Sequence, residues 1–123
     1  MLGSEKLVAF VGTRDPVRAS AFYGGVLGLP LVSEDGFALV FDAHGTMLRV
    51  SIVAEVAVAG YTVLGWEVPD AAAAAKQLAD RGVALERFEG LPQDELGIWT
   101  APSGARVGWF KDPDQNILSI SQF

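Results

Sequence analysis

The most constraining feature of the sequence is a repeated order of predicted elements. Each copy begins with a β-rich strand, continues with an aspartate-capped helix and ends with three shorter strands. The two capping residues, Asp15 and Asp70, lie 55 positions apart. A regular interval of this kind indicates two copies of one structural unit. We therefore expect two βαβββ modules, at about residues 6–54 and 61–123, within a single domain of residues 1–123.

Both helices carry signals at their ends. Asp15 is followed by proline at the first helical position, and this helix is predicted to run to about Leu27, with Gly28 as its C-terminal cap. The second helix is rich in alanine and is predicted to run from Asp70 to Gly82. Four apolar residues of the first helix lie near helical spacing and should face the sheet: Val17, Ala21, Phe22 and Val26.

The strands are predicted from short β-branched and aromatic runs between turn residues. In the first module they are residues 6–13, 30–33, 37–41 and 47–53, with turns at Asp35-Gly36 and His44-Gly45. In the second module they are residues 61–68, residues 83–88 and two strands within residues 106–122.

The last two strands are joined by the turn Asp112-Pro113-Asp114-Gln115-Asn116. Proline fixes its own φ, and the Asp and Asn side chains can bond nearby backbone groups. This hairpin resembles the C-terminal hairpin of the vicinal oxygen chelate superfamily, which includes glyoxalase I, bleomycin-resistance proteins and extradiol dioxygenases. The family pattern is aromatic-x-Asp-Pro-Asp-Gly-Asn-aliphatic-aliphatic-Glu, so Gln115 replaces its glycine and Ser119 its glutamate. Residues 22–29, Phe-Tyr-Gly-Gly-Val-Leu-Gly-Leu, resemble the family's Phe-Tyr-x-x-x-Leu-Gly-Leu helix end.

The resemblance implies an α+β fold in which two paired βαβββ modules form a curved, open-barrel mixed sheet with helices on its outer face. In metal-binding members of the family, four strands supply the metal ligands. The corresponding positions here are Val8, Arg49, Val63 and Ser119. Two valines, an arginine and a serine cannot hold a divalent cation, which needs imidazole or carboxylate ligands. The single histidine, His44, lies in a predicted turn and reads as a surface residue, so we expect no metal and no other cofactor.

Strand alternation predicts which side chains share the cavity with these four positions. Gly65 would leave space for a ligand, and an inward Arg49 would need either Glu67 or an anionic ligand group as its partner. The predicted ligand-binding residues are Val8, Phe10, Arg49, Ser51, Val63, Gly65, Glu67, Trp99, Trp109 and Ser119.

The connection before residue 106 is longer than its counterpart in the first module and contains Trp99. Trp99 either covers a cleft or packs on the nearest strand. Trp66 is out of phase with the cavity residues and should pack against a helix, whereas the pattern leaves Trp109 undecided. Asp94 and Glu95 are either an acid and base on a lid or solvated loop charges.

Composition limits the partners. The net charge is −6, which disfavours nucleic acid and acidic membrane surfaces. The apolar runs are far shorter than the roughly 20 residues that cross a membrane. The chain contains no cysteine, so disulfides and thiolate ligands are excluded. The N-terminus shows no signal-peptide pattern, and we expect a cytoplasmic protein.

The favoured hypothesis is a metal-free protein that binds a small organic molecule, planar or cationic, and resembles the bleomycin-resistance branch of the family. The resemblance also implies a homodimer. The alternative is a metal-dependent lyase, isomerase or dioxygenase with atypical ligands, such as Glu67, Asp94, Glu95 or His44. A third hypothesis, a structural or regulatory module, would require an obstructed cavity.

Overall fold

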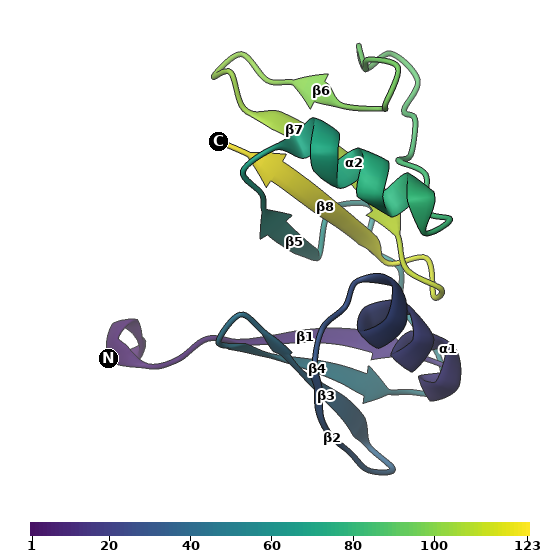
Figure 1. Ribbon diagram of the computed structural model, residues 1–123. Helices are drawn as coiled ribbons and strands as arrows, with labels where there is room; N and C mark the ends of the chain where they lie inside the picture. The colour runs from purple at the N-terminus through teal and green to yellow at the C-terminus, as the bar shows by residue number, and fades with distance from the viewer. The chain divides into compact units, whose positions relative to one another are not determined.

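The computed structural model describes residues 1–123, which form two compact units, Met1–Ala57 and Val58–Phe123. Each unit contains a four-stranded mixed sheet and a helix on one face of that sheet (Figure 1). No helix of the structure combines the length and the apolar character needed to cross a membrane.

Unit 1 has the order βαβββ. The sheet order is β1-β4-β3-β2, in which the edge strand β1 is parallel to β4 and the remaining pairs are antiparallel. The elements are β1 (Val8–Thr13), α1 (Pro16–Ser20), a π-helical segment (Ala21–Val26), β2 (Leu31–Glu34), β3 (Ala38–Ala43) and β4 (Thr46–Ile52), after a short 3-10 turn (Leu2–Ser4).

Unit 2 repeats this topology. The sheet order is β5-β8-β7-β6, with β5 and β8 parallel and the other pairs antiparallel. The elements are β5 (Leu64–Glu67), α2 (Ala71–Asp80), β6 (Trp99–Thr100), β7 (Arg106–Lys111) and β8 (Ile117–Gln122). The predicted α+β architecture of two βαβββ modules is therefore confirmed.

The first helix begins and ends where the sequence predicts. Asp15 Oδ1 accepts hydrogen bonds from the backbone N–H groups of Val17 and Arg18, both at 3.1 Å, and Pro16 occupies the first helical position. After Ser20 the helix widens into the π-helical segment, and Gly28, with φ of 76°, terminates it.

The predicted inner face of this helix is partly wrong. Val17 is 78% exposed and Ala21 is also exposed, whereas Ala19, Phe22 and Tyr23 are buried. The buried residues follow the i, i+3, i+4 spacing of one helical stripe, which excludes the stripe that carries Val17 and Ala21. Within this core, the rings of Tyr23 and Phe41 have centroids 6.0 Å apart.

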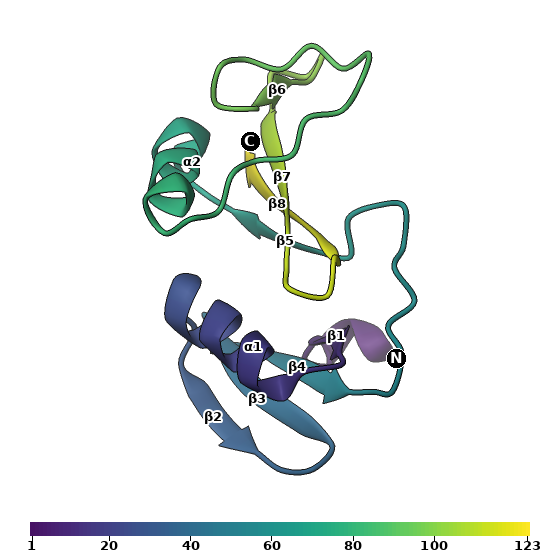
Figure 2. The same cartoon turned by 90° about the vertical axis from the view of Figure 1, so that its right-hand side faces the viewer.

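The second helix packs on its sheet through small side chains. Asp70 Oδ1 accepts a hydrogen bond from the N–H of Ala73, which confirms the predicted cap. The buried residues of α2 are Ala71, Ala75 and Leu78, and those of the strands include Phe110, Leu118 and Ile120. Figure 2 shows α2 along one side of the sheet formed by β5, β7 and β8. Trp66 stacks on Phe110, with ring centroids 6.3 Å apart, so it packs with the core as predicted.

Residues 83–88 do not form the predicted strand. The edge of β7 is paired instead with β6, and residues 83–88 contact β7 through a backbone bond from the N–H of Glu86 to the carbonyl of Trp109, 2.7 Å. Leu85 fills the space above Gly108 and Gly97, where an added Cβ would lie within 3 Å of it. β6 pairs with β7 only at Arg106 and Val107, and residues 83–88 meet β7 at Trp109 through this one backbone bond, which is too little to form a strand ladder.

The predicted C-terminal hairpin is confirmed. Asp112 is buried, and its Oδ1 accepts hydrogen bonds from the N–H groups of Asp114 and Asn116, both at 2.9 Å. Its Oδ2 accepts a bond from Asn116 Nδ2, 2.8 Å. Gln115 has φ of 72°, in the left-handed region where the family pattern has glycine.

Candidate functional site

The face of the second sheet opposite α2 gathers several of the predicted site residues. Ser119 on β8 is paired in register with Gly65 on β5 and with Trp109 on β7. Glu67 lies two residues after Gly65 and shares its side of the sheet. Val63 immediately precedes β5, and its N–H donates to the carbonyl of Ile117, 3.0 Å.

Ser119 is buried, with 7% of its surface exposed. A Cβ added to Gly65 would lie 2.6 Å from Ser119 Oγ, so the glycine leaves room for the serine hydroxyl. The hydroxyl of Ser119 therefore fills part of the space that Gly65 was predicted to leave for a ligand.

A concavity of about 350 Å³ lies on the same unit, and we name it the aromatic pocket. Three rings form its wall, from Phe88, Trp99 and Trp109. The ring centroids of Trp99 and Trp109 are 6.1 Å apart, and those of Phe88 and Trp109 are 5.5 Å apart in an edge-to-face arrangement. The other lining residues are Gly60, Tyr61, Thr62, Leu91 and Ile117.

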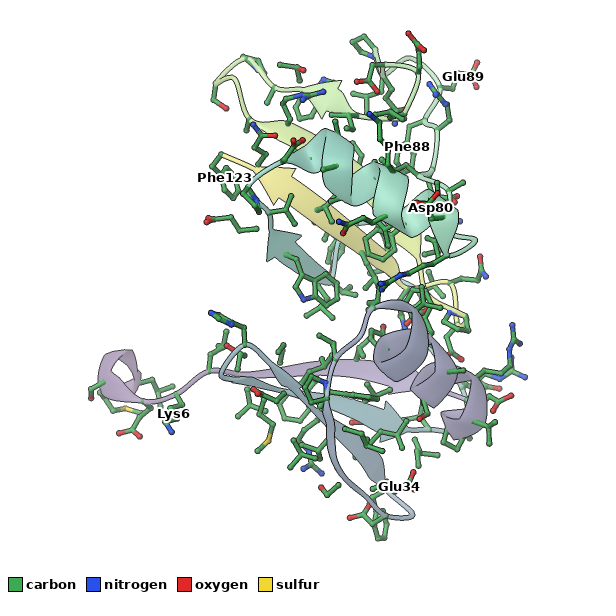
Figure 3. The ribbon with its side chains drawn as sticks, viewed as in Figure 1. Lys6, Glu34, Asp80, Phe88, Glu89 and Phe123 are labelled. Atoms are coloured by element: carbon green, nitrogen blue, oxygen red, sulfur yellow. The ribbon has the colours of Figure 1, made fainter.

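The long connection between α2 and β6 holds one of these rings, Phe88, and leads into β6, which holds Trp99. Figure 3 shows Phe88 on this connection. Gln93 Nε2 donates to the carbonyls of Glu86 and Gly97, 2.9 and 2.8 Å, and Gln93 Oε1 accepts the N–H of Phe88, 2.8 Å. The backbone of Gln93 also forms an isolated β-bridge with Trp99. These contacts of Gln93, which we name the amide clamp, link the segment around Phe88 to Gly97 and Trp99.

The third ring is fixed from β7. Trp109 Nε1 donates to Thr62 Oγ1, 3.1 Å, which sets the orientation of the indole. Trp99 pairs with Val107 across the β6–β7 ladder and also lines the pocket. Trp99 therefore combines the two alternatives, because it lines a concavity and is also paired with the neighbouring strand.

The aromatic pocket is apolar and uncharged. No Asp, Glu, Lys, Arg or His side chain is among its lining residues, and Tyr61 and Thr62 supply the hydroxyl groups. Exposed aromatic faces bind flat organic groups by stacking, and their negative quadrupole also attracts cations. Such a surface can bind and orient a molecule. Its lining residues include no nucleophile next to a general base.

The predicted residues of unit 1 form a separate set on one face of its sheet. Phe10 on β1 is in register with Arg49 on β4, and Gly12 is in register with Ser51. Val8 shares this face by alternation, opposite the buried residues of the helix side. Phe10 is 61% exposed. Because Glu67 belongs to unit 2, its pairing with Arg49 remains a prediction.

The four positions that correspond to the family's metal ligands carry unsuitable side chains, as the sequence indicates. No group of three or more His, Asp or Glu side chains in the structure could hold a metal ion. His44 is exposed in the β3–β4 turn with φ of 51°. Val8, Arg49, Val63 and Ser119 offer neither an imidazole nor a carboxylate, so the side chains at these four positions do not fit a divalent cation.

Asp94 has a structural role. Its Oδ1 accepts the N–H groups of Leu96 and Ile98, both at 2.9 Å, and its Oδ2 lies 3.4 Å from Arg106 Nη2. The hydrogen bond from Ile98, with smaller help from Leu96 and Arg106, lowers the pKa of Asp94 below its ordinary value. Since a stabilised carboxylate is a weak base, this favours the loop-charge alternative for Asp94. The neighbouring Glu95 accepts a bond from Arg87 Nη2 through its backbone carbonyl, 2.7 Å.

Of the residues that line the aromatic pocket, the predicted ligand-binding set contains Trp99 and Trp109 only. Sequence reasoning assigned Phe88 to the strand at residues 83–88 and Tyr61 and Thr62 to the strand at residues 61–68, and it did not place Gly60 or Leu91 at a site. The available signal was the unusual number of large apolar residues in a long connection.

Comparison with known proteins gives structural matches only. No protein-family model and no curated protein sequence matches the chain.

The structural matches cover nearly the whole chain. A glyoxalase/bleomycin resistance protein/dioxygenase superfamily member from Sphaerobacter thermophilus has a TM-score of 0.75, 20% identity and coverage of 100% of both chains. A lactoylglutathione lyase from Agrobacterium tumefaciens has a TM-score of 0.74 and 16% identity over 97% of this chain and 93% of its own. TnmS3, an antibiotic binding protein from Streptomyces, has a TM-score of 0.72 and 22% identity over 99% of this chain and 98% of its own. The chain therefore has the glyoxalase/bleomycin resistance protein/dioxygenase fold, as the two motifs resembling the vicinal oxygen chelate superfamily predict.

Proposed function

We propose that this protein binds a small planar organic molecule, without a metal ion, and that the aromatic pocket supplies the main contact surface. The observation that carries the proposal is the wall of three rings, Phe88, Trp99 and Trp109, around a concavity of about 350 Å³. This volume falls within the roughly 300–1,000 Å³ typical of small-molecule sites.

The chemistry of the wall favours a flat ligand. Stacking on an aromatic face contributes about 0.5–1.5 kcal/mol beyond the burial of apolar surface. Before any ligand arrives, Thr62 holds the indole ring of Trp109, and Gln93 holds the backbone of Phe88. Pre-organisation of this kind lowers the entropy lost on binding.

A positive charge on the ligand would add to the affinity. The protein has a net charge of −6, and a cation is attracted to aromatic faces. The pocket itself contains no carboxylate that would require one. A neutral planar molecule should therefore bind as well, with lower affinity.

The predicted cavity residues from the two sheets extend this proposal. Ser119, Gly65 and Glu67 lie on the same face of the sheet as Trp109, and Val63 adjoins them. Val8, Phe10, Arg49 and Ser51 occupy one face of the other sheet. We propose that Ser119, Gly65, Glu67 and Val63 contact parts of the ligand that reach beyond the rings, in a cytoplasmic homodimer. A ligand contact of the unit 1 residues stays a separate prediction.

A binding role is favoured over metal-dependent turnover. One structural neighbour is named as an antibiotic binding protein and another as a lactoylglutathione lyase, so the fold serves both kinds of protein. The side chains at the four ligand positions support the first kind, because none is a carboxylate or an imidazole.

The test is a fluorescence titration of the purified chain with three probes: proflavine as a planar cation, 1-naphthol as a planar neutral molecule and tetraethylammonium as a cation without a plane. We expect proflavine to bind most tightly and tetraethylammonium not to bind. Replacing Trp99 by leucine should weaken proflavine binding about tenfold, which corresponds to about 1.4 kcal/mol. Trp66→Phe is the matched control, because Trp66 stacks in the core, and it should leave the affinity unchanged.

Metal content is measured on the same preparation. We expect no stoichiometric metal and no change in melting temperature with Mn²⁺, Ni²⁺, Zn²⁺, Fe²⁺ or a chelator, because a ligand of the folded state raises stability by mass action. One tightly held divalent ion per chain would overturn the metal-free proposal. Equal binding of all three probes would overturn the role of the rings.

A further inference from the structure

Unit 1 contains a second concavity, of about 900 Å³, on the helix side of its sheet. We name it the helix–hairpin groove, because the first helix lines one side and the turn between β2 and β3 lines the other. Its apolar walls include Val17, Ala21, Leu39 and Ile52, and the turn contributes Glu34 and Asp35. Figure 3 shows Glu34 on this hairpin.

The exposed stripe of the first helix faces this groove. Val17 is 78% exposed and Ala21 is exposed, and both line the groove instead of entering the core. Apolar side chains that line a concavity, rather than lying singly on a convex surface, are typical of binding sites.

Three glycines line the groove, Gly24, Gly25 and Gly36, and none has a positive φ. A Cβ added to Gly25 or Gly36 would meet no atom within 4 Å, and one added to Gly24 would make an ordinary 3.4 Å contact with Phe41. Neither backbone conformation nor packing therefore requires glycine at these positions.

Gly25 is the most informative of the three. It lies within the helical segment Ala21–Val26, where glycine is less favourable than alanine because it loses more conformational entropy on folding. This segment is π-helical, a rare geometry that is frequent at functional sites. The unfavourable glycine is explained if the space above it is needed for something other than this chain.

The polar side chains of the groove favour a positively charged ligand. Its lining includes two carboxylates and no Lys, Arg or His. Both hydrogen bonds to the Asp35 side chain, from the N–H groups of Phe37 and Ala38 at 2.7 and 3.0 Å, go to Oδ1, which leaves Oδ2 for another donor. The bond from Phe37, followed by that from Ala38 and by the charge of Arg49, lowers the pKa of Asp35, so it is ionised at neutral pH.

We propose that the helix–hairpin groove binds a small organic cation with a compact apolar body. The hydrocarbon part lies against Val17, Ala21 and the open space above Gly25, and the ammonium group lies at Glu34 and Asp35. This site is independent of the aromatic pocket, because it belongs to the other unit and selects by charge and volume instead of by stacking.

The proposal is tested by ¹⁵N-resolved NMR of the full chain with three probes that share one apolar cage. They are 1-aminoadamantane, a cation; 1-adamantanol, which is neutral; and adamantane-1-carboxylate, an anion. We expect the amine to shift the amide signals of Ala21, Gly25 and Gly36, the alcohol to shift them only at higher concentration, and the carboxylate to leave them unchanged.

Two variants probe the two halves of the site. Gly25→Leu should weaken binding of the amine at least tenfold by filling the groove. Asp35→Asn should weaken it several-fold, because asparagine keeps an oxygen for the backbone bonds and removes the charge. Gln77→Leu, which adds an exposed leucine to α2, is the control and should change nothing.

Gly25→Ala separates a binding role from a structural one. Alanine should leave the melting temperature unchanged or raise it, and should weaken binding of the amine. A sharp loss of stability would show that the glycine serves the fold and would overturn the proposal.

Other outcomes also decide the matter. Equal shifts with the carboxylate and the amine, or no shift at all in unit 1, would contradict the proposed site. Shifts confined to the signals of Trp99 and Trp109 would assign the amine to the aromatic pocket and leave the proposed function intact. Concentration-dependent shifts at Gly25 without any probe would identify a second copy of the chain as the occupant and overturn the small-cation proposal.

Discussion

The two units share one topology and differ in the connection that follows the helix. In unit 1 the chain passes from Gly28 almost directly into β2 (Leu31–Glu34), and the helix itself lines a glycine-rich groove. In unit 2 the chain runs from the end of α2 at Asp80 to Trp99 before the corresponding strand begins, and this connection carries Phe88 to the aromatic pocket. One topology therefore carries two different concavities: the groove of unit 1 lies on the helix side of its sheet, whereas the aromatic pocket of unit 2 adjoins the face opposite α2 and depends on the long connection.

If the long connection of unit 2 is packed as firmly as a strand, a side chain added at Gly97, where it packs closely against Leu85, should be destabilising. Gly97 has φ of 93°, and an added Cβ would lie 2.9 Å from Leu85 Cβ. We expect Gly97→Ala to lower the free energy of unfolding by about 2–3 kcal/mol, through backbone strain and overpacking. Urea unfolding measures this loss. Gly12→Ala in unit 1 is the control, because its Cβ would make only an ordinary 3.4 Å contact with Val53.

The same connection should loosen when its amide clamp is removed. Gln93→Ala deletes three hydrogen bonds to backbone groups, and we expect a loss of about 2 kcal/mol, allowing for new bonds to water. Hydrogen exchange should accelerate at the N–H of Phe88 and leave the sheet of unit 1 unchanged. Gln77→Ala on the exposed side of α2 is the matched control. Unchanged protection at Phe88 would contradict the clamp.

One turn carboxylate in each unit allows a comparison by pH. The pKa values of Asp94 and Asp35 are both lowered from 3.8, chiefly by hydrogen bonds from Ile98 and Phe37. Because the folded pKa is the lower one, each group contributes stability that is present above about pH 3.8 and is lost as the pH falls through the folded value. Both groups are exposed, so we expect a small effect, removed by Asp94→Asn or Asp35→Asn. A side-chain carboxyl signal that titrates at or above 3.8 would refute the assignment.

The smallest expected effect concerns the turns between the last two strands of each unit. Residues with positive φ other than glycine occur at both, His44 in unit 1 and Gln115 in unit 2. We expect Gln115→Gly to raise stability by about 0.5 kcal/mol, because the relief of strain slightly exceeds the extra entropy of the unfolded chain. Thermal unfolding measures the change, and a lower melting temperature would be the contrary result.

Local signals predicted the frame of this fold. Asp15 and Asp70 cap helices because their side chains meet the first free N–H groups of the helix, and no distant residue is needed for that. The hairpin at residues 112–116 was predictable for the same reason, since Asp112 bonds groups within four residues of itself.

Features that depend on distant contacts were predicted less well. Val17 and Ala21 seemed to belong to the core because apolar residues occur on both sides of the first helix, and only the position of the sheet separates the two sides. Residues 83–88 have the composition of a strand, but they reach β7 through a single backbone bond, from Glu86 to Trp109, and form no ladder.

The candidate site was predictable in part. The alternation of β7 and β8 places Trp109 beside Ser119, which follows from the hairpin once its register is known. The approach of Phe88 to Trp109 depends on Gln93, and no local pattern in the sequence specifies a side-chain clamp.

The most direct test of the central claim, a ligand held by the aromatic pocket, is the response of the three indole N–H signals in an NMR titration with proflavine. Trp99 and Trp109 line the pocket, whereas Trp66 stacks on Phe110 in the core. The account predicts saturable shifts of the Trp99 and Trp109 signals and an unchanged Trp66 signal. Saturation of no indole signal, or a shift of Trp66 as large as the other two, would contradict it.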